Sequence, residues 1–280
     1  MAKIQIQLKS NSINFWNFAN ISKSNKIPHG IIFKQALKQK VLTDDNFKLL
    51  EKFIDFLIKN ERNYQSQLYQ DTFAAFVIHN NYNKTFLEFG AADGIDLSNS
   101  YTLEKDFLWS GALGEPDPQW ENILKKNRPK SKIINKCIWS VSDKKIKFFS
   151  SKKPLLSTID DFKFSDLKSM PDNSEDRNRE GKNLEVETVS LNHVIEREFD
   201  DVCPSYISID TEGSELDILQ SFNFEKYNPV VFTIEHNYTE KERYIDELLE
   251  KNNYVRVFKK LTLFDAWYIS REALTKLTSY

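Results

Sequence analysis

The chain has 280 residues, 40% of them hydrophobic, which is enough to bury the core of one large domain or of a domain with an appendage. Its 39 basic and 41 acidic side chains nearly cancel, which argues against a dedicated nucleic-acid binder. No run approaches the ~18 apolar residues of a membrane span, and the N-terminus lacks the apolar segment of a signal peptide. Only Cys137 and Cys203 occur, without metal-type spacing. We therefore expect a cytoplasmic protein, and the sequence leaves its oligomeric state open.

The N-terminal part of the chain favours helices. Apolar side chains recur at helical spacing in residues 43–60, where Thr43 and the two aspartates after it suit the start of a helix. Residues 66–80 favour a second helix that leads into the first strand. We therefore expect residues 1–80 to form a helical extension or cap, and residues 81–280 to form the main domain.

From residue 85 onward, strand patterns alternate with helical patterns. We expect strands at 85–89, 110–116, 132–140, 145–151, 205–210, 229–237, 254–260 and 265–270, and helices at 98–107, 118–127, 214–222 and 240–252. This alternation predicts a doubly wound α/β sheet, mostly parallel, with an antiparallel hairpin strand near the C-terminus. Residues 163–183 are polar and rich in breakers, and we expect them to form a mobile insertion or lid.

The turn after the first expected strand has the composition of a nucleotide cradle. A dinucleotide fingerprint set on Gly90 would need a third glycine where the chain has Ile95, which weakens an NAD interpretation. Read from Glu88 to Gly94, the string is E-x-G-x-A-x-G, a close variant of the first loop of S-adenosylmethionine-dependent methyltransferases. Small residues here let the backbone approach the methionine part of that cofactor. The candidate contacts in this turn are Glu88, Gly90, Ala91, Asp93 and Gly94, the two carboxylates favouring the cationic ammonium and sulfonium region.

Further candidate contacts lie beyond this turn. Glu115 ends the second expected strand, where one carboxylate can accept hydrogen bonds from both hydroxyls of a ribose, and Pro116 follows it. Ser98 and Asn99 either cap the following helix or bind the cofactor carboxylate. Backbone near Ile138 is the candidate for the adenine side. Each of these residues has a structural alternative, as a turn, a cap or a solvated loop residue.

Taken together, the quoted motifs resemble a known family. The strings "FLEFGAADGIDLSNSYTLEKDFLWSGALGEPDP", "YISIDTEGSELDIL" and "FTIEHN" resemble the FkbM family of S-adenosylmethionine-dependent methyltransferases, over about Ser66 to Ile269. The resemblance implies a class I methyltransferase (Rossmann-like) fold, with S-adenosylmethionine as cofactor. It also implies O-methylation of a small polar acceptor, such as a sugar or nucleotide-sugar, in glycan or secondary-metabolite biosynthesis.

The residues that take part in the reaction itself are expected at the ends of two later strands. Asp210 ends one buried strand, and Glu235 and His236 end its neighbour, so all three are expected at one rim of a parallel sheet. In one interpretation they bind Mg²⁺ or Mn²⁺, which lowers the pKa of an acceptor hydroxyl. In the other, His236 is the general base and no metal is used. Because successive strand residues point to opposite faces, Glu235 and His236 face the same side only if the strand has already ended.

Two other functions stay open at this point. A nucleotide-dependent oxidoreductase would share the fold, but the missing third glycine and the polar end of the strand at 229–237 count against it. A catalytically silent nucleotide-binding scaffold of the same fold would be free to lose its polar rim, and this chain retains one. A methyltransferase is therefore the leading interpretation.

Overall fold

The computed structural model describes residues 47–60, 64–78, 82–259 and 261–278. The chain divides into one unit of residues 1–62 with 258–263 and a second of residues 63–257 with 264–280. The first unit contains α3 (Phe47–Lys59), which confirms the helix expected at 43–60 from Phe47 onward. Within this unit the rings of Phe53 and Phe258 stack at 5.9 Å. Most of the expected cap, including Thr43, lies outside the described residues.

The second unit is built on a seven-stranded sheet with the order β10-β11-β9-β8-β1-β2-β3. Its strands are β1 (Thr85–Phe89), β2 (Ser110–Gly114), β3 (Lys132–Ile134), β8 (Tyr206–Ile209), β9 (Val231–Glu235), β10 (Tyr254–Val257) and β11 (Asp265–Ser270). The pairs β1–β2, β1–β8, β2–β3 and β8–β9 are parallel, whereas β11 runs antiparallel to both of its neighbours. This confirms the doubly wound class I methyltransferase arrangement, with its antiparallel strand near the C-terminus.

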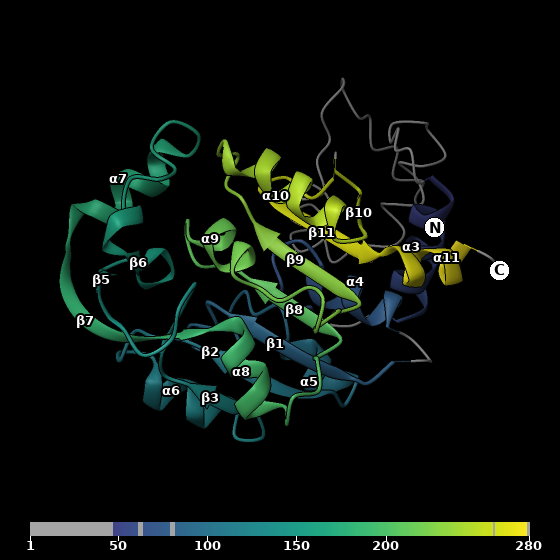
Figure 1. The fold of residues 1–280 in the computed structure, drawn as a ribbon, viewed down its shortest axis with the longest axis horizontal. Coiled ribbons are helices and arrows are strands. Elements are labelled where there is room, and N and C mark those ends of the chain that lie inside the picture. The colour runs from purple at the N-terminus through teal and green to yellow at the C-terminus, as the bar shows by residue number, and fades with distance from the viewer. Residues whose placement is uncertain (1–46, 61–63, 79–81, 260, 279–280) are drawn as a thin grey trace, which may run out of the picture. The chain divides into compact units, whose positions relative to one another are not determined.

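The helices of the second unit cover both faces of this sheet (Figure 1). They are α4 (Gln70–Val77), α5 (Tyr101–Asp106), α6 (Glu121–Asn127), α8 (Leu191–Glu198), α9 (Glu215–Gln220), α10 (Lys241–Lys251) and α11 (Arg271–Thr278). Helix α4 lies against α5 and β9, so it groups with the sheet and the division of the chain falls at residue 62 instead of near 80. None of the described helices is long and apolar enough to cross a bilayer.

The two faces of the central strands differ in polarity. Ile207 and Ile209 of β8 belong to a large apolar core that also contains side chains of α8, α9 and α10. The alternate residue Ser208 points the other way and accepts a hydrogen bond at 3.0 Å from the Asn99 side chain, just before α5. Glu88 of β1 faces the same side. Polar side chains are therefore layered under one face of the sheet, next to the ends where ligands bind in such folds.

A second sheet of four strands, ordered β4-β7-β5-β6, lies beyond the ends of β8 and β9 (Figure 1, left). It comprises β4 (Cys137–Trp139), β5 (Lys145–Ser151), β6 (Thr158–Ile159) and β7 (Gly181–Ser190), with two short 3-10 helices, η1 (Pro154–Leu156) and η2 (Asp160–Phe162). The single strand expected at 132–140 is therefore wrong. It is two strands in different sheets, because the polar pair Asn135 and Lys136 turns the chain between them.

Residues 163–183 differ from the irregular lid expected from their composition, because they contain α7 (Pro171–Arg179) and the start of β7. The fully buried Arg177 of α7 explains this. Its guanidinium donates to the Leu156 and Lys163 carbonyls, to both oxygens of Asp166 and to Glu212, which uses all five of its N–H donors. A single cation thus organises the segment and ties it to the turn after β8.

Candidate active site

The loop after β1 approaches the end of β8 so closely that it requires a glycine. Gly90 has a φ of +80°, and a Cβ on it would lie 1.9 Å from the backbone oxygen of Asp210. Its N–H donates to the Gly114 carbonyl of β2 at 3.1 Å. Ala91, the next residue, is buried. The small residues expected at 90 and 91 therefore lie where β1, β2 and β8 end together.

The far side of this loop is held by the end of α6. Oδ1 of Asp93 accepts from the N–H groups of the two residues Ile95 and Asp96, both at 2.8 Å. The loop carbonyls are bound in turn by Asn127, which donates to Asp93 O at 2.8 Å, and by Arg128, which donates to Gly94 O at 3.0 Å. Asp93 thus shapes the loop.

Asn127 and Arg128 were not among the expected site residues. Their only signal in the sequence is that they stand at the end of the helix expected at 118–127, directly before Pro129. Arg128 is fully buried and pairs with Glu104 at 2.9 Å. Because it also contacts Gly94, whose added Cβ would lie 2.7 Å from Arg128 Cγ, it fixes the position of the whole loop.

Glu88 supports the loop from below and does not face an open site. Its carboxylate accepts from the Ser98 hydroxyl at 2.9 Å, from the Asn99 N–H at 2.7 Å and from the Ser100 hydroxyl. Burial raises its pKa, although the charge of Arg128 opposes the shift. Ser98 in turn accepts from the N–H of Tyr101 at 3.1 Å, so its hydroxyl bonds to the first residue of α5, whose N-cap is Ser100.

Glu115 lies directly beside the loop, as expected for the end of β2. Its two oxygens accept separately from the Ala92 N–H at 3.0 Å and from the Asp117 N–H at 2.8 Å. Burial raises the pKa of this carboxyl group to about 7. Pro116 after it is half-buried, and Ile138 of β4 is buried in the large apolar core.

A small polar cavity of about 10 Å³ lies on the polar face of the sheet, at the ends of β8 and β9. It is lined by Gln67, Gln70, Asn99, Ser208, Ile209, Asp210, Thr233, Glu235, Phe264 and Asp265. Asn99 is 7% exposed, and its Oδ1 accepts no hydrogen bond from any described residue. A buried acceptor without a donor is costly, so this atom is available to a ligand or a water.

Three carboxylates converge where β8 and β9 end. One oxygen each of Asp210, Glu212 and Glu235 lies within 4.8 Å of the others. Burial, together with the repulsion among these carboxylates, raises the pKa of Asp210 and of Glu235 well above the usual range. Because the two buried carboxyl groups disfavour each other's charge, the folded protein favours a proton on the pair Asp210 and Glu235. We call these three residues the acid cluster.

Glu212 links the acid cluster to the second sheet and its helix α7. Its Oε2 accepts from Arg177 at 2.5 Å and from Asn237 at 3.5 Å. Burial nevertheless raises its pKa to about 7. The turn that carries it is also held by the Thr158 hydroxyl, which donates to the Glu212 carbonyl at 3.0 Å.

The structure does not bring His236 to the acid cluster, although it was expected there as a ligand or base. Strand β9 is still extended at Glu235, so the next side chain points to the opposite face, toward β10 and α10. There the His236 Nδ1 accepts from the Tyr238 N–H at 3.1 Å, and its Nε2 lies 3.2 Å from an Arg256 nitrogen. Burial lowers its pKa to about 4. Glu212, and not His236, is the third residue beside Asp210 and Glu235.

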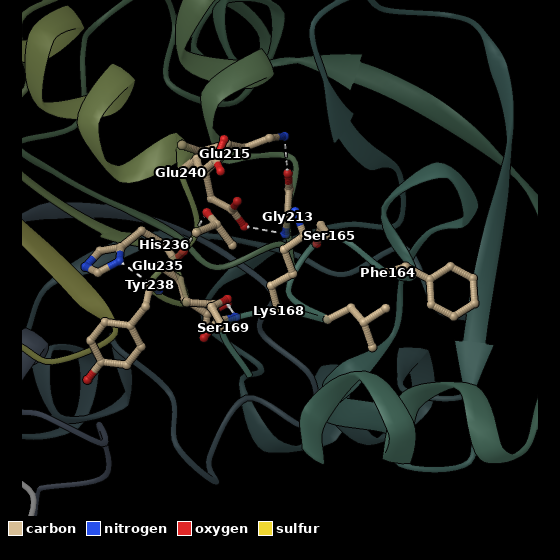
Figure 2. A pocket seen from close by; sticks show the side chains of 14 residues that line it. Phe164, Ser165, Lys168, Ser169, Gly213, Glu215, Glu235, His236, Tyr238 and Glu240 are labelled. Atoms are coloured by element: carbon tan, nitrogen blue, oxygen red, sulfur yellow. Dashed lines mark hydrogen bonds between the residues drawn. The ribbon is translucent and has the colours of Figure 1, made fainter. Parts of the chain in front are cut away.

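A larger hollow of about 650 Å³ opens beside Glu235 (Figure 2). One wall comes from the turn before α7 and the other from the connection between β9 and α10. Its lining residues are Phe164, Ser165, Leu167, Lys168, Ser169, Gly213, Glu215 and the run from Glu235 to Lys241. Its volume lies within the range of small-molecule pockets, about 300–1,000 Å³.

Comparison with known proteins gives one family match. The family model described as "Methyltransferase FkbM domain" matches residues 88–256. Among solved structures, a precorrin-6y C5,15-methyltransferase from Geobacter metallireducens is 11% identical, with 70% of this chain and 75% of that chain covered and a TM-score of 0.34. The SAH-bound methyltransferase PaMTH1 of Podospora anserina is 9% identical, with coverages of 94% and 99% and a TM-score of 0.36. No curated protein matches the sequence.

Proposed function

Because this chain belongs to the FkbM methyltransferase family, we propose that it transfers the methyl group of S-adenosylmethionine to a hydroxyl of a sugar, nucleotide-sugar or similar small polar acceptor. The observation that carries the choice of a hydroxyl is the pair Asp210 and Glu235. Both carboxyl groups have raised pKa values and lie between the Gly90 loop and the 650 Å³ hollow. A buried pair of this kind is a stronger base than an ordinary carboxylate.

The residues around the Gly90 loop fit S-adenosylmethionine. When bound, this cofactor supplies an electrophilic methyl group on a sulfonium sulfur. Glu115 is a buried carboxyl group beside the loop, where its oxygens can accept hydrogen bonds from the ribose hydroxyls. Its ionised form would place a negative charge near the cofactor. The free Oδ1 of Asn99 suits a donor such as the cofactor ammonium. The backbone near Ile138 remains the candidate for the adenine side.

Proton removal is assigned to the acid cluster. In the proposed transfer, the carboxylate of the Asp210–Glu235 pair would accept the proton that the acceptor hydroxyl gives up. Asn237 donates to Glu235 at 2.7 Å and keeps that carboxyl group oriented. His236 takes no part in this step, because its ring faces Arg256 on the other side of β9.

The acid cluster also fits Mg²⁺ or Mn²⁺. Asp210, Glu212 and Glu235 offer hard oxygen ligands, and a cation would relieve the repulsion among these carboxylates that raises the pKa of Asp210 and Glu235. Such a cation would supply charge that lowers the pKa of an acceptor hydroxyl. A cluster of three carboxylates, with Glu212 in place of His236, is thus the proposed metal-binding set.

A labelled-methyl transfer assay tests the proposal. Purified protein is incubated with methyl-tritiated S-adenosylmethionine and a panel of sugars and nucleotide-sugars. Glu235→Gln is expected to lower transfer by about 10²–10⁴-fold, the usual contribution of a general base. Glu240→Gln is the matched control, because Glu240 lines the same hollow but is exposed.

Three results would contradict parts of the proposal. A Glu235→Gln variant as active as the wild type removes the acid cluster from the reaction. Tight cofactor binding without transfer to any acceptor favours the silent scaffold. Transfer that is unchanged after exhaustive chelation removes the cation and leaves the carboxyl pair as sole base.

A further inference from the structure

The large hollow beside Glu235 gathers exposed apolar side chains. Nine large hydrophobic side chains are exposed among the described residues, and three of them line this hollow. These are Phe164, Leu167 and Tyr238, with exposed fractions of 59%, 49% and 47%. The concentration of such side chains around one hollow is typical of a binding surface for apolar groups.

One of these side chains is held in place by strained backbone. Asn237 and Tyr238 are consecutive non-glycine residues with φ values of 46° and 53°. The left-handed conformation costs of order 1–3 kcal/mol at such residues. It is maintained by hydrogen bonds: the Tyr238 N–H donates to His236 Nδ1 at 3.1 Å, and the Asn237 N–H donates to the Phe264 carbonyl at 3.1 Å. The structure thus fixes Tyr238 at the edge of the hollow.

The opposite wall is equally well supported. Phe164 and Leu167 lie on the turn before α7, and Arg177 binds this turn through the Lys163 carbonyl and both oxygens of Asp166. Figure 2 shows Phe164 on one side of the hollow and Tyr238 on the other, with Lys168 and Ser169 between them. The apolar groups are therefore preformed, which reduces the entropy that a ligand would lose on ordering them.

The charges of the hollow disfavour an anionic ligand. Its lining contains Glu215, Glu235 and Glu240 against Lys168 and Lys241. The ammonium of Lys241 is already engaged by Asp217 at 3.1 Å and by the Gly213 carbonyl at 2.7 Å. Even when Glu235 is protonated, a phosphate or carboxylate in this hollow would face Glu215 and Glu240, whereas one of the two lysines, Lys241, is already paired with Asp217.

From these observations, and resting on the function proposed above, we propose that the hollow binds an acceptor with two parts. A hydroxylated part reaches Glu235, and an uncharged apolar group, aryl or alkyl, packs against Phe164 and Leu167 on the wall before α7. The substrate class is therefore a neutral glycoside or polyol joined to an apolar group. Free sugars lack the apolar group, and sugar phosphates are not neutral.

Binding measurements on the full chain with bound S-adenosylhomocysteine test this proposal. The probes are 4-nitrophenyl β-glucoside, glucose and glucose 1-phosphate, titrated in a calorimeter. We expect the aryl glucoside to bind at least about tenfold more tightly than glucose, since an apolar group leaves water. Leu167→Ser is expected to remove most of this difference. Leu108→Ser, which changes a side chain that is 82% exposed and lies outside the hollow, should leave it intact.

Several outcomes would overturn the proposal. Equal affinity for glucose and its aryl glycoside removes the apolar subsite. Preference for glucose 1-phosphate that is lost in Lys168→Ala shows an anion site. If Leu108→Ser weakens binding of the aryl glucoside as much as Leu167→Ser does, the binding is non-specific adsorption. If the protein self-associates and Leu167→Ser abolishes this, the hollow is an interface between copies of the chain.

The assays also separate this inference from the proposed function. If the aryl glucoside binds with the expected dependence on Leu167 but no polyol or glycoside receives a methyl group, the hollow stands and the proposed function fails. If sugar phosphates are methylated and aryl glycosides are neither bound nor methylated, the function stands and this inference fails.

Discussion

The titration of Glu115 gives a quantitative prediction for cofactor binding. Burial raises the pKa of this carboxyl group from 4.5 to about 7 in the free protein. A ribose that donates its hydroxyls to Glu115 binds the ionised form. Affinity is therefore expected to rise as the pH increases through 7 and to level off above it. At pH 6 about one tenth of the free protein would be ionised, so affinity should be about tenfold lower than at pH 8, or about 1.4 kcal/mol.

Calorimetric titration with S-adenosylhomocysteine at pH 6, 7 and 8 measures this effect. Because the ligand amino group also titrates, the informative quantity is the difference between the wild type and Glu115→Gln. In Glu115→Gln, the tenfold change in affinity between pH 6 and pH 8 that Glu115 causes should disappear. The change in affinity that the ligand amino group causes should remain. Circular dichroism checks that it is folded. Parallel pH profiles for the two proteins, or an affinity that rises on acidification, would refute the reasoning.

Four other expectations follow from the geometry. Gly90→Ala should abolish binding of S-adenosylhomocysteine, because the new Cβ would meet the Asp210 carbonyl at 1.9 Å; wild-type affinity would contradict this. Arg128→Met should lower the urea-derived free energy of unfolding by about 3–5 kcal/mol, since Glu104 would stay buried without its partner, and a loss below about 1 kcal/mol would count against it. His236→Gln should leave Mn²⁺ affinity unchanged in electron paramagnetic resonance titrations, whereas a tenfold loss would return this histidine to the metal site. The free energy of unfolding should fall as the pH rises from 5 to 8, because the folded state keeps protons on carboxyl groups with raised pKa values, among them Glu115 and Asp265, that the unfolded state releases near pH 4; a rise in urea titrations would contradict the shifts.

The main sheet could be predicted because its strands are short, apolar and separated by helices. The turn at Gly90 and the acids at 115, 210 and 235 follow strand ends in the sequence, so the topology alone places them along one edge. The break between β3 and β4 was missed because only two polar residues, Asn135 and Lys136, separate two short apolar runs. Two strands in different sheets then look like one long strand.

Other features depend on contacts that no local pattern reveals. Helix α7 has the sequence PDNSEDRNR, without an apolar face, and it is organised by the buried Arg177. Arg128 looks like an ordinary charged residue at a helix end, yet it is fully buried under the loop. The side chain of His236 was misplaced because the sequence does not show which residue of β9 is the last extended one. Side chains alternate between the two faces of a sheet, so an error of one residue places the side chain on the wrong face.

The central claim, a cofactor site at the Gly90 loop with Glu115 as its acid, is tested most directly by titration at pH 8. S-adenosylhomocysteine and NAD are titrated into the wild type, into Glu115→Ala and into Glu121→Ala, where Glu121 forms an ion pair with Lys125 on α6. We expect one S-adenosylhomocysteine per chain, no binding of NAD, a loss of at least about tenfold in Glu115→Ala and no change in Glu121→Ala. Binding of NAD in place of S-adenosylhomocysteine, or wild-type affinity in Glu115→Ala, would contradict the account.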